Sequence, residues 1–356
     1  MVEKQRKNQL QAIVEPLLGW YAQNARALPW RQDRQPYHVW VSEIMLQQTR
    51  VEAVRGYYER FLVSLPDIRA LADCPEARLM KLWEGLGYYR RARNLQSAAQ
   101  TVVTQYGGAF PEDYQSIRAL AGIGDYTAGA IASICFDQPT PAVDGNVLRI
   151  MARLTNCHEV VDTPACKRDF EAQLQAIYPS HAPGAFTQAL MELGACVCTP
   201  RSPQCSACPV RDCCRAFALG TQAALPVRKA KKARRVEMRT VFLLDAHGKL
   251  ALRKRPAEGL LAGMWELPAA AGDLSAQAAL EQARAWGLDP TAMERTLHHV
   301  HVFTHIEWHM TCHVMRVARE AGELVWVTRE ALGEDYALPS AFRPFLEDYA
   351  SLTAKQ

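Results

Sequence analysis

The sequence predicts a multi-domain protein in which an all-α part is followed by an α+β part. The chain has 356 residues, more than a single hydrophobic core usually serves, so two domains are expected. Apolar residues follow helical spacing in the first part, and no strand pattern appears before about residue 236. Beyond that point β-rich segments are mixed with helical ones, which indicates a separate α+β domain.

The first part reads as a series of helices separated by proline, glycine and aspartate. Apolar residues at three-four spacing predict one helix over residues 4–24. Pro29 cannot continue that helix, so residues 25–31 are expected to form a loop. Further helices are predicted at residues 39–48, 51–61, 76–84, 89–105, 114–120, 125–136, 147–155, 167–177 and 185–195.

A basic segment separates the two parts. Residues 228–235 hold six Lys or Arg in eight positions, which predicts an exposed linker over 221–235 between domains at 1–220 and 236–356. In the second domain, strands are predicted at 239–245, 249–254, 299–303, 307–314 and 324–327, with helices at 275–285 and 341–349.

Charge and cysteine usage narrow the class of protein. The formal net charge of +4 is modest, so binding to nucleic acid would depend on local basic patches. No apolar run approaches the roughly 18 residues of a membrane span, and the N-terminus lacks a signal-peptide core. We therefore expect a cytoplasmic protein without a membrane partner. Eleven cysteines, six of them within residues 196–214, favour a local metal site over disulfides.

Residues 120–146 combine a glycine-rich turn, a helix start and an acidic helix cap. Gly122 and Gly124 flank one apolar residue, which permits a tight turn and exposes backbone N–H groups that suit a phosphate. The predicted helix at 125–136 carries small residues on one side, including Gly129, so a partner helix can approach closely. Taken alone, the same pattern also fits an ordinary interhelical turn.

Two carboxyl groups are candidates for chemistry. Glu43 is the only charge among mostly apolar neighbours in residues 39–48, and burial there would raise its pKa. Asp144 precedes a predicted helix, whose N-terminus should hold its carboxylate ionised. By itself Asp144 fits a simple helix cap, but together with Glu43 it gives one acid and one anion.

Four cysteines have the spacing C-x6-C-x2-C-x5-C within residues 198–214. An all-thiolate zinc site is one interpretation, although zinc sites usually join two short C-x2-C arms across a longer gap. Only the middle pair is tight here, which favours a [4Fe-4S] cluster. The ligands would be Cys198, Cys205, Cys208 and Cys214.

These features together closely resemble the helix-hairpin-helix, endonuclease III-like DNA glycosylases that carry an iron-sulfur cluster. Within that superfamily, the segment Trp40–Val51 with Glu43, and the added C-terminal domain, are similar to the adenine glycosylases. The resemblance spans nearly the whole chain. It implies a [4Fe-4S] cofactor and excision of adenine mispaired with 8-oxoguanine or guanine in double-stranded DNA. A monomer is expected.

The resemblance also implies roles for the residues of the active site. Glu43 would protonate adenine and help to activate water, while Asp144 would stabilise the oxocarbenium-like state, as an anion or as a transient covalent partner. Asn146 would help to orient this site. Lyase members carry a Schiff-base lysine where this chain has Tyr126, so we predict a monofunctional glycosylase.

DNA contacts follow from the same resemblance. Gln48 and Tyr88 would be wedge residues that enter the stack near the lesion after the base is flipped out. The turn around Gly122 and Gly124 would grip a phosphate. The adenine pocket would be lined by Arg26, Leu28, Arg31 and Gln188.

The C-terminal domain resembles a Nudix fold, most clearly in residues 259–268. The helix that follows lacks the paired glutamates that would hold magnesium, so we expect lesion recognition rather than pyrophosphate hydrolysis. The loop that would recognise 8-oxoguanine reads Phe303-Thr304-His305, where the family typically has serine in the middle. Thr304 keeps a hydroxyl donor and adds a methyl group.

Two other functions stay open at this point. One is an endonuclease III-like glycosylase and lyase for oxidised pyrimidines, which Tyr126 and the extra domain disfavour. The other is a non-enzymatic, cluster-bearing protein for DNA binding or electron transfer, in which Glu43 would be incidental.

Overall fold

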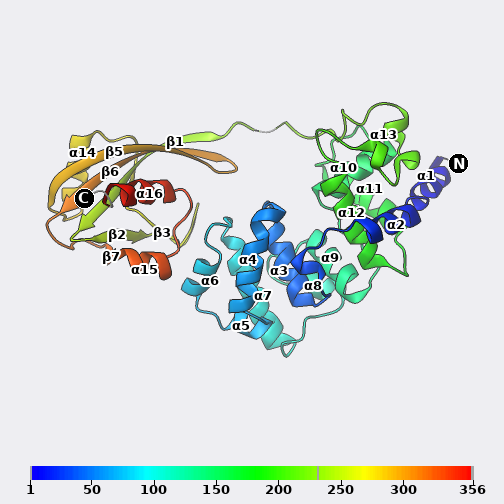
Figure 1. Cartoon of the computed structure of the whole chain (residues 1–356), viewed down its shortest axis with the longest axis horizontal. Coiled ribbons are helices and arrows are strands. Elements are labelled where there is room, and N and C mark those ends of the chain that lie inside the picture. Colours follow the sequence, from blue (N-terminus) through cyan, green and yellow to red (C-terminus); the bar gives the residue numbers. More distant parts are fainter. Residues whose placement is uncertain (1, 231, 354–356) are drawn as a thin grey trace. The chain divides into compact units, whose positions relative to one another are not determined.

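The computed structural model describes residues 2–230 and 232–353. It divides into two compact units, the first formed by Met1–Cys74 with Arg93–Ala230 and the second by Pro75–Ala92 with Lys231–Gln356. The first unit is helical and the second is built on a mixed β-sheet (Figure 1), so the predicted fold class is confirmed. The boundaries at residues 220 and 236 stay a prediction, and residue 231 of the predicted linker lies outside the described residues.

Short helices joined by tight turns make up the first unit. Helix α7 begins in the second unit and continues into the first, and helix α6 (Glu76–Leu82) belongs to the second. The elements of the first unit are α1 (Val2–Gln11), α2 (Val14–Asn24), η1 (Pro29–Arg31), α3 (Pro36–Leu46), α4 (Val51–Ser64), α5 (Ile68–Ala72), α7 (Arg90–Gln105), α8 (Tyr114–Ala119), α9 (Asp125–Phe136), α10 (Gly145–Thr155), α11 (Pro164–Gln175), α12 (Pro183–Cys196), η2 (Cys205–Ala207), η3 (Arg211–Cys213) and α13 (Arg215–Ala218).

The single helix predicted over residues 4–24 is wrong, because the chain forms α1 and α2 with a break between them. Pro16 lies in the first turn of α2, where its missing N–H is tolerated. In one continuous helix the same proline would leave the carbonyl of Ala12 without a donor. The apolar spacing is therefore right, and the proline decides where the helix divides.

Helices α8 and α9 form a hairpin around the glycine-rich turn (Figure 1). Helix α9 has the predicted bounds, since Gly124 caps its start and Asp137 adopts the left-handed conformation at its end. The close approach expected at Gly129 is to a loop, and the close approach between two helices is made at Gly184 instead. A Cβ on Gly129 would lie 2.2 Å from the carbonyl oxygen of Pro141, a loop residue, whereas a Cβ on Gly184 of α12 would lie 2.8 Å from the Ser133 oxygen in α9.

The core of the first unit holds α10 in place. Its apolar side chains pack with those of α2, α11 and α12, and each such buried side chain contributes about 1.5–3 kcal/mol. Because α10 begins directly after Asp144, this packing fixes the position of a candidate catalytic carboxylate.

The second unit is a seven-stranded sheet with the order β3-β2-β1-β6-β5, in which β4 also pairs with β1 and β7 with β2. Strands β1 and β6 are parallel, with Val241 opposite Cys312, and the other pairs are antiparallel. The elements are β1 (Arg235–Ala246), β2 (Lys249–Lys254), β3 (Trp265–Glu266), β4 (Ala269–Ala271), α14 (Ala276–Ala285), β5 (Pro290–Val302), β6 (Ile306–Val317), β7 (Val325–Val327), α15 (Arg329–Glu334) and α16 (Arg343–Thr353).

Helices cover both faces of this sheet. Alternate residues of β1 point to opposite sides, so Phe242 packs with α14 and Leu243 packs with α15 and α16. Each of the five predicted strands overlaps a strand of this unit, but β5 begins at Pro290, nine residues before the predicted 299–303. Strands β3 and β4 are additional short strands.

Candidate active site and cysteine cluster

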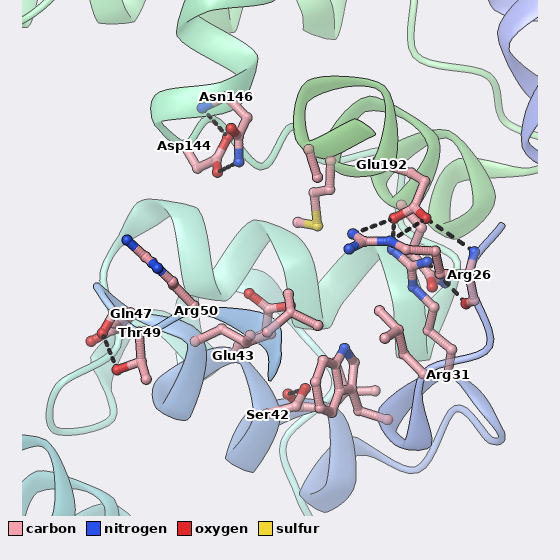
Figure 2. Close-up of a pocket in the computed structure, with 18 of the residues that line it drawn as sticks. Arg26, Arg31, Ser42, Glu43, Gln47, Thr49, Arg50, Asp144, Asn146 and Glu192 are labelled. Carbon is pink, nitrogen blue, oxygen red and sulfur yellow. Dashed lines mark hydrogen bonds and ion pairs between the residues drawn. The ribbon is translucent and has the colours of Figure 1, made fainter. Parts of the chain in front are cut away.

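A pocket of about 790 Å³ opens in the first unit, between α3, α9, α12 and the N-terminus of α10. The predicted catalytic residues Glu43, Tyr126, Asp144 and Asn146 all line it, and so do the four residues predicted for the adenine pocket and Gln48. Figure 2 shows Glu43 and Asp144 reaching this pocket from different helices. Residues that are about 100 positions apart in the sequence are therefore brought together.

Glu43 lies on α3 and is 6% exposed. Its Oε2 accepts a hydrogen bond of 2.7 Å from the Tyr126 hydroxyl. The pKa of Glu43 is raised to about 7. Burial is the largest cause and the nearby Asp144 carboxylate acts in the same direction, while the Tyr126 hydrogen bond and Arg31 lower the pKa. A carboxyl group in this state can carry a proton at neutral pH.

Asp144 is the N-cap of α10. Its Oδ1 accepts hydrogen bonds of 2.8 Å from the backbone N–H groups of Asn146 and Val147, and its Oδ2 accepts one of 2.8 Å from the Asn146 side-chain amide. Burial raises the pKa of Asp144 despite these donors, so the helix N-terminus alone does not set its pKa. All three hydrogen bonds favour the carboxylate form of Asp144.

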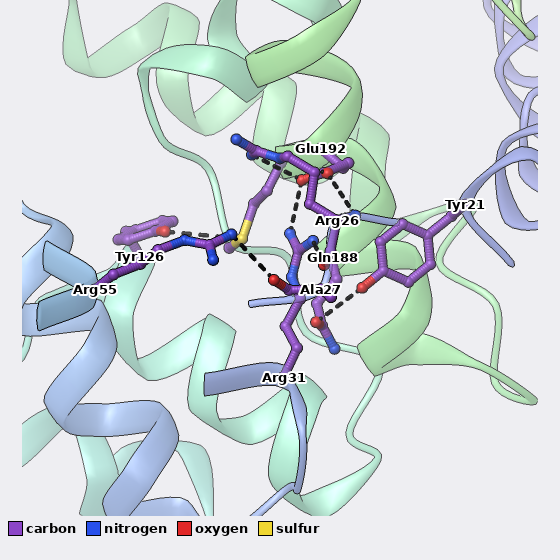
Figure 3. A network of polar contacts seen from close by, with 9 residues as sticks. Tyr21, Arg26, Ala27, Arg31, Arg55, Tyr126, Gln188 and Glu192 are labelled. Atoms are coloured by element: carbon purple, nitrogen blue, oxygen red, sulfur yellow. Dashed lines mark hydrogen bonds and ion pairs between the residues drawn. The ribbon is translucent and has the colours of Figure 1, made fainter. Parts of the chain in front are cut away.

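Another buried carboxylate, Glu192 on α12, also lines the pocket, and Figure 3 shows it with Arg26 and Arg31. It accepts hydrogen bonds from Arg26 Nε at 2.7 Å and from Arg31 Nη2 at 2.9 Å. Although burial opposes ionisation, these two arginines lower the pKa of Glu192 to about 2. Gln188, one turn away, accepts a hydrogen bond of 2.9 Å from the Tyr21 hydroxyl. The sequence analysis missed Glu192, which fixes two predicted pocket residues.

Asn146 links Asp144 to the cysteine loop through one arginine. Arg149 Nη2 donates to Asn146 Oδ1 at 2.9 Å and to the Gly194 carbonyl at 2.8 Å, while its Nε donates to the Cys198 carbonyl at 2.7 Å. Because Arg149 is 5% exposed, these hydrogen bonds are shielded from water. The loop and the catalytic helix cap are thus parts of one hydrogen-bonded network.

The four predicted cluster ligands, Cys198, Cys205, Cys208 and Cys214, line one small cavity of about 30 Å³. Burial raises the pKa of the Cys208 thiol to about 11, and Arg153 donates a hydrogen bond of 3.2 Å from Nη1 to the sulfur of Cys198. Thiols in such surroundings ionise when a metal centre binds them. Within residues 2–230 and 232–353, no three His, Cys, Asp or Glu side chains converge tightly enough to hold a single metal ion.

The backbone is left-handed at several residues predicted to contact DNA. Gln48 and Tyr88 have φ of 59° and 48°, and non-glycine residues adopt this conformation at a cost in free energy. Gly122 has φ of 76°, and a Cβ there would lie 2.7 Å from the Asn94 Cβ, so the turn requires glycine. The expected row of free N–H groups needs one correction, because Ile123 N–H bonds to the Leu120 carbonyl.

The predicted recognition loop is the β5–β6 turn of the second unit. The Thr304 and Tyr88 hydroxyl groups are 2.8 Å apart, and both residues belong to this unit. The centroids of the Phe303 and Trp308 rings are 4.8 Å apart. The His305 carbonyl accepts a hydrogen bond from the Arg235 backbone N–H. Two residues predicted separately, from the wedge and from the lesion loop, therefore form one hydrogen-bonded pair.

The fold and the pocket define a DNA glycosylase of the helix-hairpin-helix class. Residues 41–176 match the family model of the HhH-GPD superfamily base excision DNA repair protein, and residues 240–348 match the NUDIX domain. A trapped endonuclease III-DNA covalent intermediate shares the fold at 24% identity and a TM-score of 0.52, over 60% of this chain and 98% of that one. No helix in the described part of the chain is long and apolar enough to cross a membrane.

Curated relatives narrow the class further. The chain is 36% identical to the human adenine DNA glycosylase, over 88% of this chain and 70% of that protein. It is 41% identical to the adenine DNA glycosylase of Arabidopsis thaliana, over 74% of this chain and 48% of that protein, so it spans about half the length of the plant relative. The chain belongs to the adenine DNA glycosylase family, and the resemblance inferred from the sequence is confirmed.

Proposed function

We propose that the chain is a monofunctional glycosylase that flips adenine out of a mispair with 8-oxoguanine or guanine in double-stranded DNA and hydrolyses its N-glycosidic bond, acting as a monomer. Adenine N-glycosylase activity in base excision repair follows from membership of the family. We propose in addition which mispair is recognised, which residue plays each role and which cofactor is bound. The observation that carries it is a buried glutamate with a pKa of about 7 across one pocket from a triply hydrogen-bonded aspartate.

Breaking the bond requires an acid for the leaving base and an anion for the sugar. Glu43 supplies the proton, because its raised pKa keeps part of the population protonated at neutral pH. After the base has left, the Glu43 carboxylate accepts a proton from the attacking water. Asp144 stabilises the positive charge that develops at the anomeric carbon, as an anion or as a transient covalent partner. Asn146 holds that carboxylate in position.

Another part of the pocket wall receives the flipped adenine. Arg26 and Arg31 are fixed by Glu192, and Leu28 and Gln188 complete the wall. Fixed donors and acceptors favour one orientation of a base over others. This wall therefore presents the leaving nitrogen of adenine to Glu43.

Tyr126 supports a monofunctional mechanism. It occupies the position that corresponds to the lysine of lyase relatives, and its hydroxyl is engaged with Glu43 at 2.7 Å. A phenol cannot form a Schiff base with the sugar. We therefore expect negligible trapping of the native enzyme on DNA by borohydride, and efficient trapping would contradict the proposal.

The cysteine cavity fits a [4Fe-4S] cluster held by Cys198, Cys205, Cys208 and Cys214. Four thiols face one cavity, and the Arg153 guanidinium beside them offers a positive charge to thiolates. The spacing of these cysteines, with only one tight C-x2-C pair, favours the cluster over zinc. When bound, the cluster cross-links the 198–214 loop that Arg149 joins to the catalytic helix.

The second unit recognises the base opposite adenine in this proposal, through the Tyr88–Thr304 pair and the neighbouring Phe303 and His305. A decisive experiment measures single-turnover base release from duplexes that carry adenine opposite 8-oxoguanine, guanine or thymine, with thymine-glycol DNA for comparison. Strand breaks are scored with and without alkali. Adenine release opposite 8-oxoguanine with alkali-dependent breaks supports the proposal. Alkali-independent breaks on thymine-glycol DNA would favour an endonuclease III-like function instead.

A further inference from the structure

A glutamine beside the cysteine cluster has a buried polar atom without a partner. The Oε1 atom of Gln222 is shielded from solvent and has no hydrogen-bond partner among residues 2–230 and 232–353. An unpaired buried polar atom is unfavourable, and native proteins rarely contain one. A partner that is absent from the chain itself would remove this cost.

The side chain of Gln222 borders the cavity that the four predicted cluster ligands also line. Two hydrogen bonds fix its position, one to the backbone of Gln222 and one from the side chain of Thr221. The Gln222 carbonyl accepts a hydrogen bond of 3.0 Å from Arg153 Nε, and the Thr221 hydroxyl donates to Asn156 Oδ1 at 2.6 Å. The same Arg153 contacts the sulfur of Cys198. One arginine therefore ties the glutamine and a cluster cysteine to α10.

A carboxamide has nearly the same shape when its oxygen and nitrogen are exchanged, so the hydrogen-bond partners decide its orientation. Thiolate and sulfide sulfurs are negatively charged acceptors, and an amide N–H group is the complementary donor. Turning the Gln222 carboxamide by half a turn places its NH₂ group where the unpaired oxygen lies. The sulfur-lined cavity then supplies the missing partner.

We propose that Gln222 donates an N–H···S hydrogen bond to the iron-sulfur cluster or one of its cysteine ligands, as a second donor beside Arg153. This inference rests on the proposed cluster. Donors to cluster sulfur stabilise the more negative, reduced form more strongly than the oxidised form. Gln222 therefore raises the reduction potential of the cluster and slows the loss of iron from it.

The first test replaces the donor and keeps the volume. Gln222→Met has a similar length, fills the same space and carries no N–H group. We expect a lower reduction potential than in the native protein and a several-fold faster loss of the brown absorbance in the presence of an iron chelator. Gln105→Met is the control, because Gln105 is an exposed glutamine that does not line this cavity. An unchanged potential in Gln222→Met would overturn the proposal and leave Gln222 with a packing role or a buried water.

A second test leaves Gln222 unchanged and so holds even if Gln222→Met loads no cluster. Gln204→Met, in which Gln222 is the one glutamine left among the residues that line the cavity, is produced with ¹⁵N in its glutamine side chains and brought to a paramagnetic oxidation state of the cluster. Pulsed electron paramagnetic resonance should then detect a ¹⁵N coupling that is absent from unlabelled protein. A loaded cluster without that coupling would overturn the role of Gln222 alone. Native protein without iron would overturn the cluster itself.

Discussion

Two glutamates line the same pocket, and the structure shifts their pKa values in opposite directions. Glu43 and Glu192 are 6% and 0% exposed, so a difference in burial does not explain the contrast. Glu43 has the neutral Tyr126 hydroxyl as its hydrogen-bond partner, whereas Glu192 is held by two guanidinium groups. The charge of the partners therefore decides which carboxyl group keeps its proton.

The hydrogen-bond partners of Asp144 are intermediate in charge between those of Glu43 and Glu192. It is half-buried, and its hydrogen-bond partners are N–H dipoles rather than full charges. Burial still raises the pKa of Asp144, because its N–H donors lower that pKa less than two arginines lower the pKa of Glu192. One pocket thus holds a proton donor at Glu43, an anion held by dipoles at Asp144 and a fixed structural anion at Glu192.

The largest effect is expected from removal of the acid. Glu43→Gln should lower single-turnover adenine release by roughly 10²–10⁴-fold, because a carboxamide cannot transfer a proton. In the native enzyme the rate should fall as pH rises above about 7, since the general acid must be protonated. Rate profiles between pH 5 and pH 9 measure both effects.

The Glu43→Gln comparison needs a check on folding and binding. The variant should bind mispaired DNA about as tightly as the native protein, since the change is confined to one buried side chain. A variant that retains full activity would support the non-enzymatic interpretation, in which Glu43 is incidental.

Removal of the structural anion should act on stability instead. Glu192→Gln leaves Arg26 and Arg31 without their anionic partner. Their side chains are 33% and 14% exposed, so the cost should be roughly 1–3 kcal/mol, below the roughly 3–5 kcal/mol of a fully buried pair. Urea unfolding measures the change, with the exposed pocket-rim variant Glu52→Gln as a control that should differ by less than about 0.5 kcal/mol. A loss no larger than that of the control would contradict the assignment of Glu192.

The pH dependence of stability should separate the two glutamates. Below its ordinary pKa the unfolded Glu192 binds a proton that the folded form lacks, so its contribution declines as pH falls from 4.5 towards 2. Glu43 has the opposite sign. The folded form keeps a proton that the unfolded form has lost, so its contribution to stability declines as pH rises from 4.5 towards 7. Unfolding curves at a series of pH values measure both slopes.

A smaller effect is expected at Tyr126. Tyr126→Phe removes the hydroxyl that favours the Glu43 carboxylate, so the pKa of Glu43 should rise and the alkaline limb of the rate profile should move to higher pH. One hydrogen bond of about 1 kcal/mol corresponds to a shift of roughly one unit or less. Tyr114→Phe, on α8 of the same hairpin, removes a hydroxyl that bonds to Asp125 instead of Glu43, so this control should leave the limb in place. A shift to lower pH would contradict the donor role of Tyr126.

Local patterns predicted much of the fold. Helix α9 has the expected bounds because Gly124 and the residue at 137 set them within a few positions. The short elements α5, α13 and α15 were missed, since four to six residues hold too little periodicity to be recognised. The sheet order also could not be read from the sequence, because the β1–β6 pairing joins segments about 70 residues apart.

The sequence predicts a site residue most clearly where one acidic residue stands among apolar neighbours. Glu43 is such a case, one acid in an apolar helix, and Glu192 gives the same signal between Met191 and Leu193. Its partners are more than 160 positions away, so its role could not be derived from spacing. The raised pKa of Asp144 could not be foreseen for a related reason. The helix N-terminus is visible in the sequence, whereas the burial that outweighs it is a property of the fold.

The smallest expected effect concerns the second unit. Thr304→Ser keeps the hydroxyl that pairs with Tyr88 and removes only a methyl group. We expect the ratio of single-turnover rates for adenine opposite 8-oxoguanine and opposite guanine to rise by roughly two- to fivefold, equivalent to less than about 1 kcal/mol. Tyr88→Phe, which removes the other hydroxyl of the pair, should lower the same ratio. An unchanged ratio in Thr304→Ser would mean that the methyl group is accommodated without cost, and a change equal for both mispairs would place the effect on DNA binding rather than on recognition of the lesion.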